Sequence, residues 1–277
     1  MKQILINDNL VKEEEAKISV FDRGFRFGDG IFETILLRNG QLLDFSLHKK
    51  RLEQGLKDIK INFKLEKIES DCQRLIKENK LRDAFIKIYI TRGESKSAYL
   101  PEKNIKPNYV ILSSDYQKPK ERRFNLVISN YQKPQIRSFN SNAKIMQGLN
   151  STLAMMEANE KKYDNAILLD QNNNISEAAS ANIFFVSKEN KIFSPKLESG
   201  LVNGVIRQKL ILDPEIEIVE EDIEVSDLDN FSNIFITNVN LRIAQIDKIF
   251  DQQDQIIWQS QNEDSLIMQL RPVIDGD

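Results

Sequence analysis

Apolar and polar residues alternate along several short segments of the chain, and this alternation predicts β-strands. The clearest case is Ala84–Thr91, where Ile86, Ile88 and Ile90 fall on one face of the predicted strand. Asn39-Gly40 separates two predicted strands, and this dipeptide favours the type I′ turn of a β-hairpin. Further apolar runs predict strands at residues 2–6, 16–22, 32–37, 41–45, 109–113, 124–129, 165–170, 182–186, 216–219 and 234–237.

Apolar residues three and four positions apart predict helices between these strands. One helix is expected to be capped by Ser46 and to run to about Ile59, and another covers residues 66–79. A further helix begins near Gly204. The helix expected after residue 142 has four apolar residues spaced for one face: Met146, Leu149, Leu153 and Met156. Strands and helices mixed in this way predict an α/β protein of the α+β type.

A charged segment near the middle of the chain predicts a domain boundary. Residues 117–123 contain Pro119 and several charges and have no hydrophobic periodicity, which is typical of a linker. We therefore predict a smaller N-terminal α/β domain over residues 1–117, a linker over 118–123 and a larger C-terminal domain over 124–277.

Charge and composition exclude several classes of protein. The 277 residues include 39 Lys and Arg against 42 Asp and Glu, and this balance argues against a nucleic-acid partner. No stretch approaches the roughly 20 apolar residues that span a bilayer, so no membrane partner is expected. One cysteine, Cys72, and one histidine, His48, cannot form a disulfide or a Cys/His zinc site. We expect a cytoplasmic protein without a metal, in which His48 packs in a helix and does not act as a catalyst.

Six fragments carry the most specific signal, because they occur together and in a fixed order. They are FDRGFRFGDGIFET (21–34), LHKKRL (47–52), TRG (91–93), KIMQGLNSTLAMMEA (144–158), ISEAASANIFF (175–185) and GVIR (204–207). The chain resembles, over about residues 2–249, the fold-type IV enzymes that depend on pyridoxal 5′-phosphate (PLP). This class IV aminotransferase family includes branched-chain and D-amino-acid aminotransferases and 4-amino-4-deoxychorismate lyases. The resemblance implies two domains, with the larger one binding PLP and the cofactor lying at the domain interface.

The resemblance assigns the covalent chemistry to Lys144, the position of the family's Schiff-base lysine. Lys144 precedes Ala154 by ten residues and Ala158 by fourteen, as in the family. A primary amine is required there because it forms an imine with the PLP aldehyde and can afterwards move protons on the substrate. Glu177 matches the carboxylate that pairs with the pyridine nitrogen and keeps the ring protonated. Taken alone, these residues could equally be a surface lysine and a glutamate at a hairpin edge.

Four further positions match the family's phosphate contacts. Arg51 would grip the phosphate with its guanidinium, although an exposed helix charge is the alternative for this residue. Val205 and Ile206 open a helix and would offer backbone N–H groups to the same phosphate. Thr237, at the end of a predicted strand, fits the last phosphate contact.

The substrate residues are predicted from the same resemblance. Arg92 in the TRG loop would meet a substrate carboxylate, or it is a structural arginine that ends a strand. Thr34 supplies a hydroxyl where the lyases have one, and Tyr99 matches the tyrosine of their Arg-Gly-Tyr sequence. The resemblance also implies a homodimer, because in relatives a loop from one subunit completes the other's site.

Departures from the family's patterns leave the reaction open. Leu149 replaces the tyrosine that branched-chain enzymes usually have five residues after the lysine, and Thr34 replaces the glycine after their Phe-Glu pair. Ser97 and Tyr99 replace the arginine and histidine of the D-amino-acid enzymes. We expect transfer of an amino group between an amino acid and a 2-oxo acid through a Lys144 Schiff base. A 4-amino-4-deoxychorismate lyase that releases pyruvate and 4-aminobenzoate is the alternative, and a PLP-binding protein without turnover is a minor one.

Overall fold

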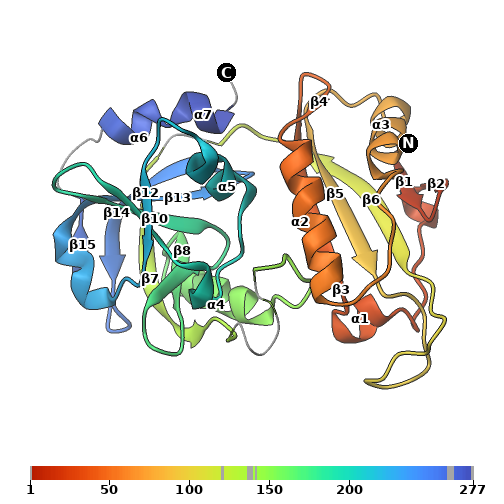
Figure 1. The fold of residues 1–277 in the computed structure, drawn as a ribbon, viewed down its shortest axis with the longest axis horizontal. Coiled ribbons are helices and arrows are strands. Elements are labelled where there is room, and N and C mark those ends of the chain that lie inside the picture. Colours follow the sequence, from red (N-terminus) through yellow and green to blue (C-terminus); the bar gives the residue numbers. More distant parts are fainter. Residues whose placement is uncertain (1, 120–121, 136–139, 141, 261–264, 276–277) are drawn as a thin grey trace. The chain divides into compact units, whose positions relative to one another are not determined.

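The chain forms two compact units. The computed structural model describes residues 2–119, 122–135, 140, 142–260 and 265–275 (Figure 1). Unit 1 comprises Met1–Lys118 together with Ala143–Gln147, and unit 2 comprises Pro119–Asn142 together with Gly148–Asp277. The break after Lys118 lies in the predicted linker, part of which lies outside the described residues. Ala143–Gln147 groups with unit 1 although the sequence-based division placed it in the second domain.

Unit 1 is built on a six-stranded sheet in the order β2-β1-β6-β5-β3-β4. Its strands are β1 (Gln3–Ile6), β2 (Asn9–Lys12), β3 (Gly30–Arg38), β4 (Gln41–Leu42), β5 (Ala84–Thr91) and β6 (Asn108–Asp115). Its helices are α1 (Arg23–Phe27), α2 (Phe45–Asp58) and α3 (Ile68–Glu78), with a 3₁₀ turn at Glu13–Glu15. The predicted isoleucine face of β5 is buried in one core with residues of α2 and α3, such as Leu52 and Leu75. The two longer helices therefore cover one face of this sheet.

Three local predictions in unit 1 have different outcomes. The hairpin turn is confirmed, since Asn39 and Gly40 have φ values of 50° and 79°, as a type I′ turn requires. Residues 16–22 are not a strand, and the partner of β1 is instead β2. Ser46 does not cap α2, which begins at Phe45 after Asp44 and has no side-chain cap.

Unit 2 is built on a nine-stranded sheet in the order β12-β11-β10-β13-β14-β7-β8-β9, with β15 paired to β14. The strands are β7 (Phe124–Gln132), β8 (Asn165–Leu169), β9 (Ile175–Ala178), β10 (Asn182–Ser187), β11 (Ile192–Pro195), β12 (Ile218–Glu221), β13 (Phe231–Asn238), β14 (Arg242–Phe250) and β15 (Ile256–Gln259). The helices are α4 (Leu149–Glu160), α5 (Val205–Leu212), α6 (Ser265–Gln269) and α7 (Arg271–Asp275), with 3₁₀ turns at Leu197–Ser199 and Val225–Asn230. No helix in the described part of the chain is long and apolar enough to cross a membrane.

The buried face of α4 differs from the predicted one. Leu149 and Met156 are 69% and 53% exposed, whereas Ala154 and Ala158 are fully buried in a cluster with Val127. Small side chains let the helix approach the sheet closely, so the alanines rather than the larger apolar residues define the contact. This packing fixes the helix that follows the segment bearing Lys144.

Candidate active site

Lys144 lies in unit 1, on a short segment that extends the sheet beside β3. The backbone N–H of Phe32 donates to the Lys144 carbonyl at 2.9 Å, and Ile31 pairs antiparallel with Ile145. The Lys144 Nζ lies 4.3 Å from the centroid of the Phe32 ring, which stacks on Tyr89 at 5.8 Å. An ammonium over an aromatic face is attracted by the electrons of the ring. The backbone of β3 and its aromatic surface therefore hold the lysine that the motifs singled out.

Arg51 belongs to a buried cluster on α2 and β3. Its Nε and Nη2 donate to the two carboxylate oxygens of Glu33 at 2.6 and 2.8 Å. His48 Nδ1 lies 2.7 Å from Glu33 Oε2, and all three side chains are at most 8% exposed. Burial raises the pKa of the Glu33 carboxyl, but the charges of Arg51 and His48 outweigh burial and hold that pKa well below its usual range. The helix spacing of His48 and Arg51 places both on one face of α2.

Two of the predicted substrate residues, Thr34 and Tyr99, lie in unit 1, and neither side chain is fully buried. Thr34 is partly buried in β3, opposite Lys87 of β5 and two residues along from Phe32, so Thr34 and Phe32 share one face of the sheet. Tyr99 is 89% exposed, and its ring centre lies 6.1 Å from that of Phe27.

Arg92 has the contacts of a structural arginine, one of the two roles predicted for it. Its Nε and Nη2 donate to the two oxygens of Asp29 at 2.8 and 2.9 Å. Nη1 and Nη2 also donate to the carbonyls of Lys60 and Ile59, just after the end of α2. Burial raises the Asp29 pKa, but the hydrogen bonds from Arg92 and Arg23 outweigh burial and lower it. Arg92 thus ties the end of α2 to the loop before β3.

Glu177 lies in unit 2, where three donors hold its carboxylate. Lys133 Nζ donates to Oε1 at 2.7 Å, with both side chains at most 7% exposed. The Asn182 Nδ2 and the Val202 backbone N–H each donate to Oε2 at 3.1 Å. Neither Lys133 nor Asn182 was singled out from the sequence. A buried cation and two further donors thus fix the position of this carboxylate.

The predicted phosphate residues of unit 2 are connected to this carboxylate through Asn182. Val205 and Ile206 begin α5, whose first backbone N–H groups have no partner within the helix. Thr237 is 1% exposed, and its Oγ1 has no hydrogen-bond partner among the described residues. Asn182 is the cross-strand neighbour of Thr237. A Cβ atom on Gly204, the residue before α5, would lie 1.9 Å from Asn182 Oδ1.

These observations test whether unit 2 fits PLP. A buried hydroxyl without a partner among the described residues and the N-terminus of α5 suit a phosphate, while a buried carboxylate suits the ring nitrogen. Asn182 connects the two, because it contacts Glu177 and lies against Gly204. The residues of this half-site therefore fit the cofactor.

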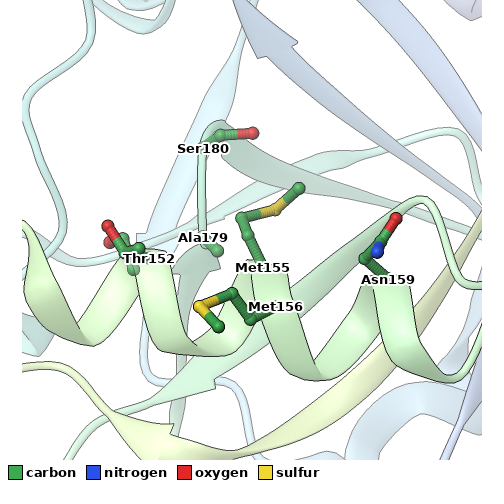
Figure 2. A pocket seen from close by; sticks show the side chains of 7 residues that line it. Thr152, Met155, Met156, Asn159, Ala179 and Ser180 are labelled. Atoms are coloured by element: carbon green, nitrogen blue, oxygen red, sulfur yellow. The ribbon is translucent and has the colours of Figure 1, made fainter.

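A separate pocket of about 460 Å³ lies in unit 2 between α4 and the turn after β9. Figure 2 shows Thr152, Met155, Met156 and Asn159 along α4, facing Ala179 and Ser180. None of the predicted site residues lines this pocket. In the part of the chain that the structure describes, no group of three or more His, Cys, Asp or Glu could hold a metal ion.

Comparison with known proteins identifies the family. The model of the family described as amino-transferase class IV matches residues 30–249, so the chain belongs to the class IV aminotransferases. A protein of Methanocaldococcus jannaschii with the provisional name branched-chain-amino-acid aminotransferase is 30% identical over 253 residues, which cover 89% of this chain and 88% of the relative. A D-alanine aminotransferase of Staphylococcus epidermidis is 28% identical over 256 residues, covering 90% and 89%. The predicted family is thereby confirmed.

Solved structures confirm the two-domain fold-type IV architecture. A branched-chain amino acid aminotransferase from Escherichia coli has a TM-score of 0.89 at 22% identity, with 99% of this chain and 93% of that one covered. The 4-amino-4-deoxychorismate lyase from Pseudomonas aeruginosa has a TM-score of 0.82 at 22% identity, covering 99% and 98%. A branched-chain aminotransferase from the archaeon Thermoproteus uzoniensis, solved with norvaline, has a TM-score of 0.88 at 22% identity, covering 99% and 95%. At this identity the structures establish the fold alone.

Proposed function

We propose that the protein is a PLP-dependent aminotransferase that moves an amino group between an amino acid and a 2-oxo acid. The observation that carries this proposal is the unit 2 half-site. There, buried Glu177 is held by Lys133 and Asn182, and Thr237 leaves a buried hydroxyl without a partner among the described residues. Membership of the class IV family supports the same cofactor.

Each residue has a distinct part in the proposal. Bound PLP supplies an aldehyde that captures the substrate amine and a ring that accepts electrons from the substrate's Cα. Lys144 would hold the cofactor covalently, and its released amine would take a proton from the substrate's Cα and deliver it to the carbon of the cofactor's former aldehyde. Glu177 would accept a hydrogen bond from the ring nitrogen.

The resemblance to the family assigns the phosphate to four positions. The first backbone N–H groups of α5, at Val205 and Ile206, and the Thr237 hydroxyl would donate to its oxygens. Arg51, which Glu33 orients, would add a positive charge. Binding of the phosphate would supply energy remote from the reacting atoms and so help to position the ring.

The residues around Lys144 suggest what kind of substrate the protein would bind. Phe32 and Tyr89 form an aromatic surface next to the amine, and Thr34 follows on the same face of the sheet. This surface suits a small amino acid with an apolar side chain. Thr34 also favours a second candidate, the lyase that releases pyruvate and 4-aminobenzoate, because a hydroxyl there can hold a proton near the reacting atoms.

The proposal includes a homodimer in the cytoplasm. Val20, Phe25, Tyr99 and Leu100 on unit 1 expose 66% to 89% of their surface, and contact with a second copy would remove this apolar surface from water. The single cysteine, Cys72, supports a compartment in which disulfides are not needed.

The decisive experiment is an absorbance spectrum of the protein with added PLP, compared with Lys144→Ala. We expect a band in the region of roughly 400–430 nm that borohydride fixes covalently onto Lys144. Conversion to pyridoxamine phosphate by amino acids would establish a transaminase. Formation of 4-aminobenzoate from aminodeoxychorismate, without a response to amino acids, would establish the lyase. Absence of the band in the wild type would contradict the proposal.

A further inference from the structure

Asn182 lies at a junction of the cofactor half-site in unit 2. It is the first residue of β10 and is 5% exposed. Its Nδ2 donates to Glu177 Oε2 at 3.1 Å and to the Val202 carbonyl at 2.8 Å, so both amide hydrogens are used. A tight turn, in which Ala178 pairs with Ala181, brings β10 back beside β9 and places Asn182 next to Glu177.

The oxygen of the same amide faces Gly204 and the start of α5, where the phosphate is predicted to bind. Asn182 Oδ1 occupies the space where a side chain on Gly204 would begin, at 1.9 Å from the ideal Cβ position. Gly204 is the N-cap of α5, so its backbone sets where the first N–H groups of that helix lie. Asn182 also pairs across the sheet with Thr237, whose buried hydroxyl has no partner among the described residues.

An asparagine is the side chain that these three contacts require. Two donors on one nitrogen serve Glu177 and the Val202 carbonyl, and the oxygen on the other side is small enough to lie against Gly204. Aspartate would place a second carboxylate 3.1 Å from Glu177, and alanine would leave that carboxylate with one donor fewer.

We propose that Asn182 is a positioning residue. It fixes the Glu177 carboxylate, which would meet the ring nitrogen, relative to the start of α5 and the Thr237 hydroxyl, which would meet the phosphate. This inference rests on the proposed function, because it assigns both ends to one PLP molecule. Its consequence is that the two ends bind PLP cooperatively. Contacts made by Glu177 strengthen those made by Thr237, because the amide of Asn182 holds Glu177 while its backbone pairs with Thr237 across the sheet.

The test measures PLP dissociation constants by equilibrium dialysis for the wild type and Asn182→Ala. Loss of a hydrogen bond to a charged group predicts a Kd about 10-fold or more higher in the variant. Asn233→Ala is the matched control, since Asn233 is a buried asparagine on β13 that bonds to Ser260. We expect its Kd to stay within about 2-fold of the wild type.

A double-mutant cycle separates positioning from a general loss of structure. Glu177→Gln and Thr237→Val are combined, first with Asn182 present and then with Asn182→Ala. We expect the two effects on PLP Kd to be non-additive by about 3-fold or more with Asn182 and additive without it. If Asn182→Ala does not fold, the same cycle in Asn182→Ser gives the test.

The outcomes distinguish this inference from the function on which it rests. A wild type that does not bind PLP overturns the proposed function and this inference with it. A wild type that binds, with an unchanged Kd in Asn182→Ala or the same coupling in both backgrounds, overturns the role of Asn182 and leaves the function standing.

Discussion

Arg51 and Glu33 form a two-point ion pair inside unit 1, with the guanidinium Nε and Nη2 donating to the two carboxylate oxygens at 2.6 and 2.8 Å. The predicted phosphate-binding arginine is therefore oriented by a carboxylate on β3. His48, from one turn earlier on α2, shares a hydrogen bond with the same carboxylate. The orientation of Arg51 depends on two residues that would not touch the phosphate.

Glu33→Gln should lower the free energy of unfolding by about 3 kcal/mol, because it removes the charge that compensates the buried Arg51. The pKa of Glu33 is lower in the folded state than its ordinary value of 4.5. The stabilisation is therefore present above about pH 4.5 and is lost as the pH falls toward the folded-state pKa. When urea unfolding is measured from pH 3 to 7, the free energy of unfolding should fall less steeply toward low pH in the variant than in the wild type. Glu53→Gln, on the exposed face of α2, is the control and should behave like the wild type.

Lys133→Met should also destabilise the protein by about 3 kcal/mol, because Glu177 would keep an uncompensated buried charge. Lys133→Arg should recover part of the loss. The double variant with Glu177→Gln should be more stable than Lys133→Met alone, since no charge is then left unpaired. The denaturant midpoints of the two single variants and the double variant measure these differences in stability. Lys196→Met, which removes an exposed pair with Asp222, should leave the midpoint unchanged, and an equal loss there would argue against a special role for Lys133.

Gly204→Ala should weaken PLP binding by about 10-fold, because the new Cβ would lie 1.9 Å from Asn182 Oδ1 and displace either the amide or the first turn of α5. Gly148 caps α4 in the corresponding way, but a Cβ there meets nothing within 4 Å. Gly148→Ala should therefore bind PLP normally. Equal PLP affinities for the two variants would show that the space beside Gly204 is not critical.

Arg92→Lys should lower the thermal midpoint without changing the KM for the amino-acid substrate by more than about 2-fold. Lysine cannot make the four hydrogen bonds that Arg92 gives to Asp29, Lys60 and Ile59. A KM increase of about tenfold at an unchanged midpoint would instead establish that Arg92 binds the substrate carboxylate. Differential scanning fluorimetry and steady-state kinetics on the same preparations separate the two results.

Cys72 should react with thiol reagents only after unfolding. The side chain is fully buried in α3, and burial, with Asp71 and Glu69 nearby, raises the pKa of the thiol to about 12. Disulfide-exchange labelling at about pH 8 should be negligible in the native protein and stoichiometric in urea. Rapid native labelling would mean that α3 opens from the sheet, and the labelling rate would then report on local unfolding of unit 1.

The motifs that resemble the class IV family pointed to Lys144, Glu177 and Arg51, and the functional roles of these residues remain predictions. The residues that contact them were not found from the sequence. Lys133 lies 44 residues from Glu177, and their contact depends on how β7, β8 and β9 pair. Such pairing is set by long-range contacts that a single sequence does not display.

Strands were predicted where apolar residues alternate with polar ones or form a longer apolar run. β5 was placed correctly from end to end, and the fully buried β10 was recognised from its apolar run. β9 and β11 are four residues long and almost entirely buried, so neither shows the alternation that marks a strand with one exposed face. The missed strand β9 carries Glu177. For α4, the large apolar residues suggested a core face, whereas two alanines form it because they permit close approach.

The five residues Ala143–Gln147 belong to unit 1, while their neighbours on both sides along the chain belong to unit 2. The polypeptide therefore passes between the units three times, and no single cut yields two complete halves. A fragment ending at Lys118 would lack the segment that pairs with β3, and the remaining fragment would carry Lys144 without the sheet that holds it. A continuous N-terminal fragment would have to extend to Gln147 to include the pairing between Ile31 and Ile145, and it would then also carry residues 119–142 of unit 2.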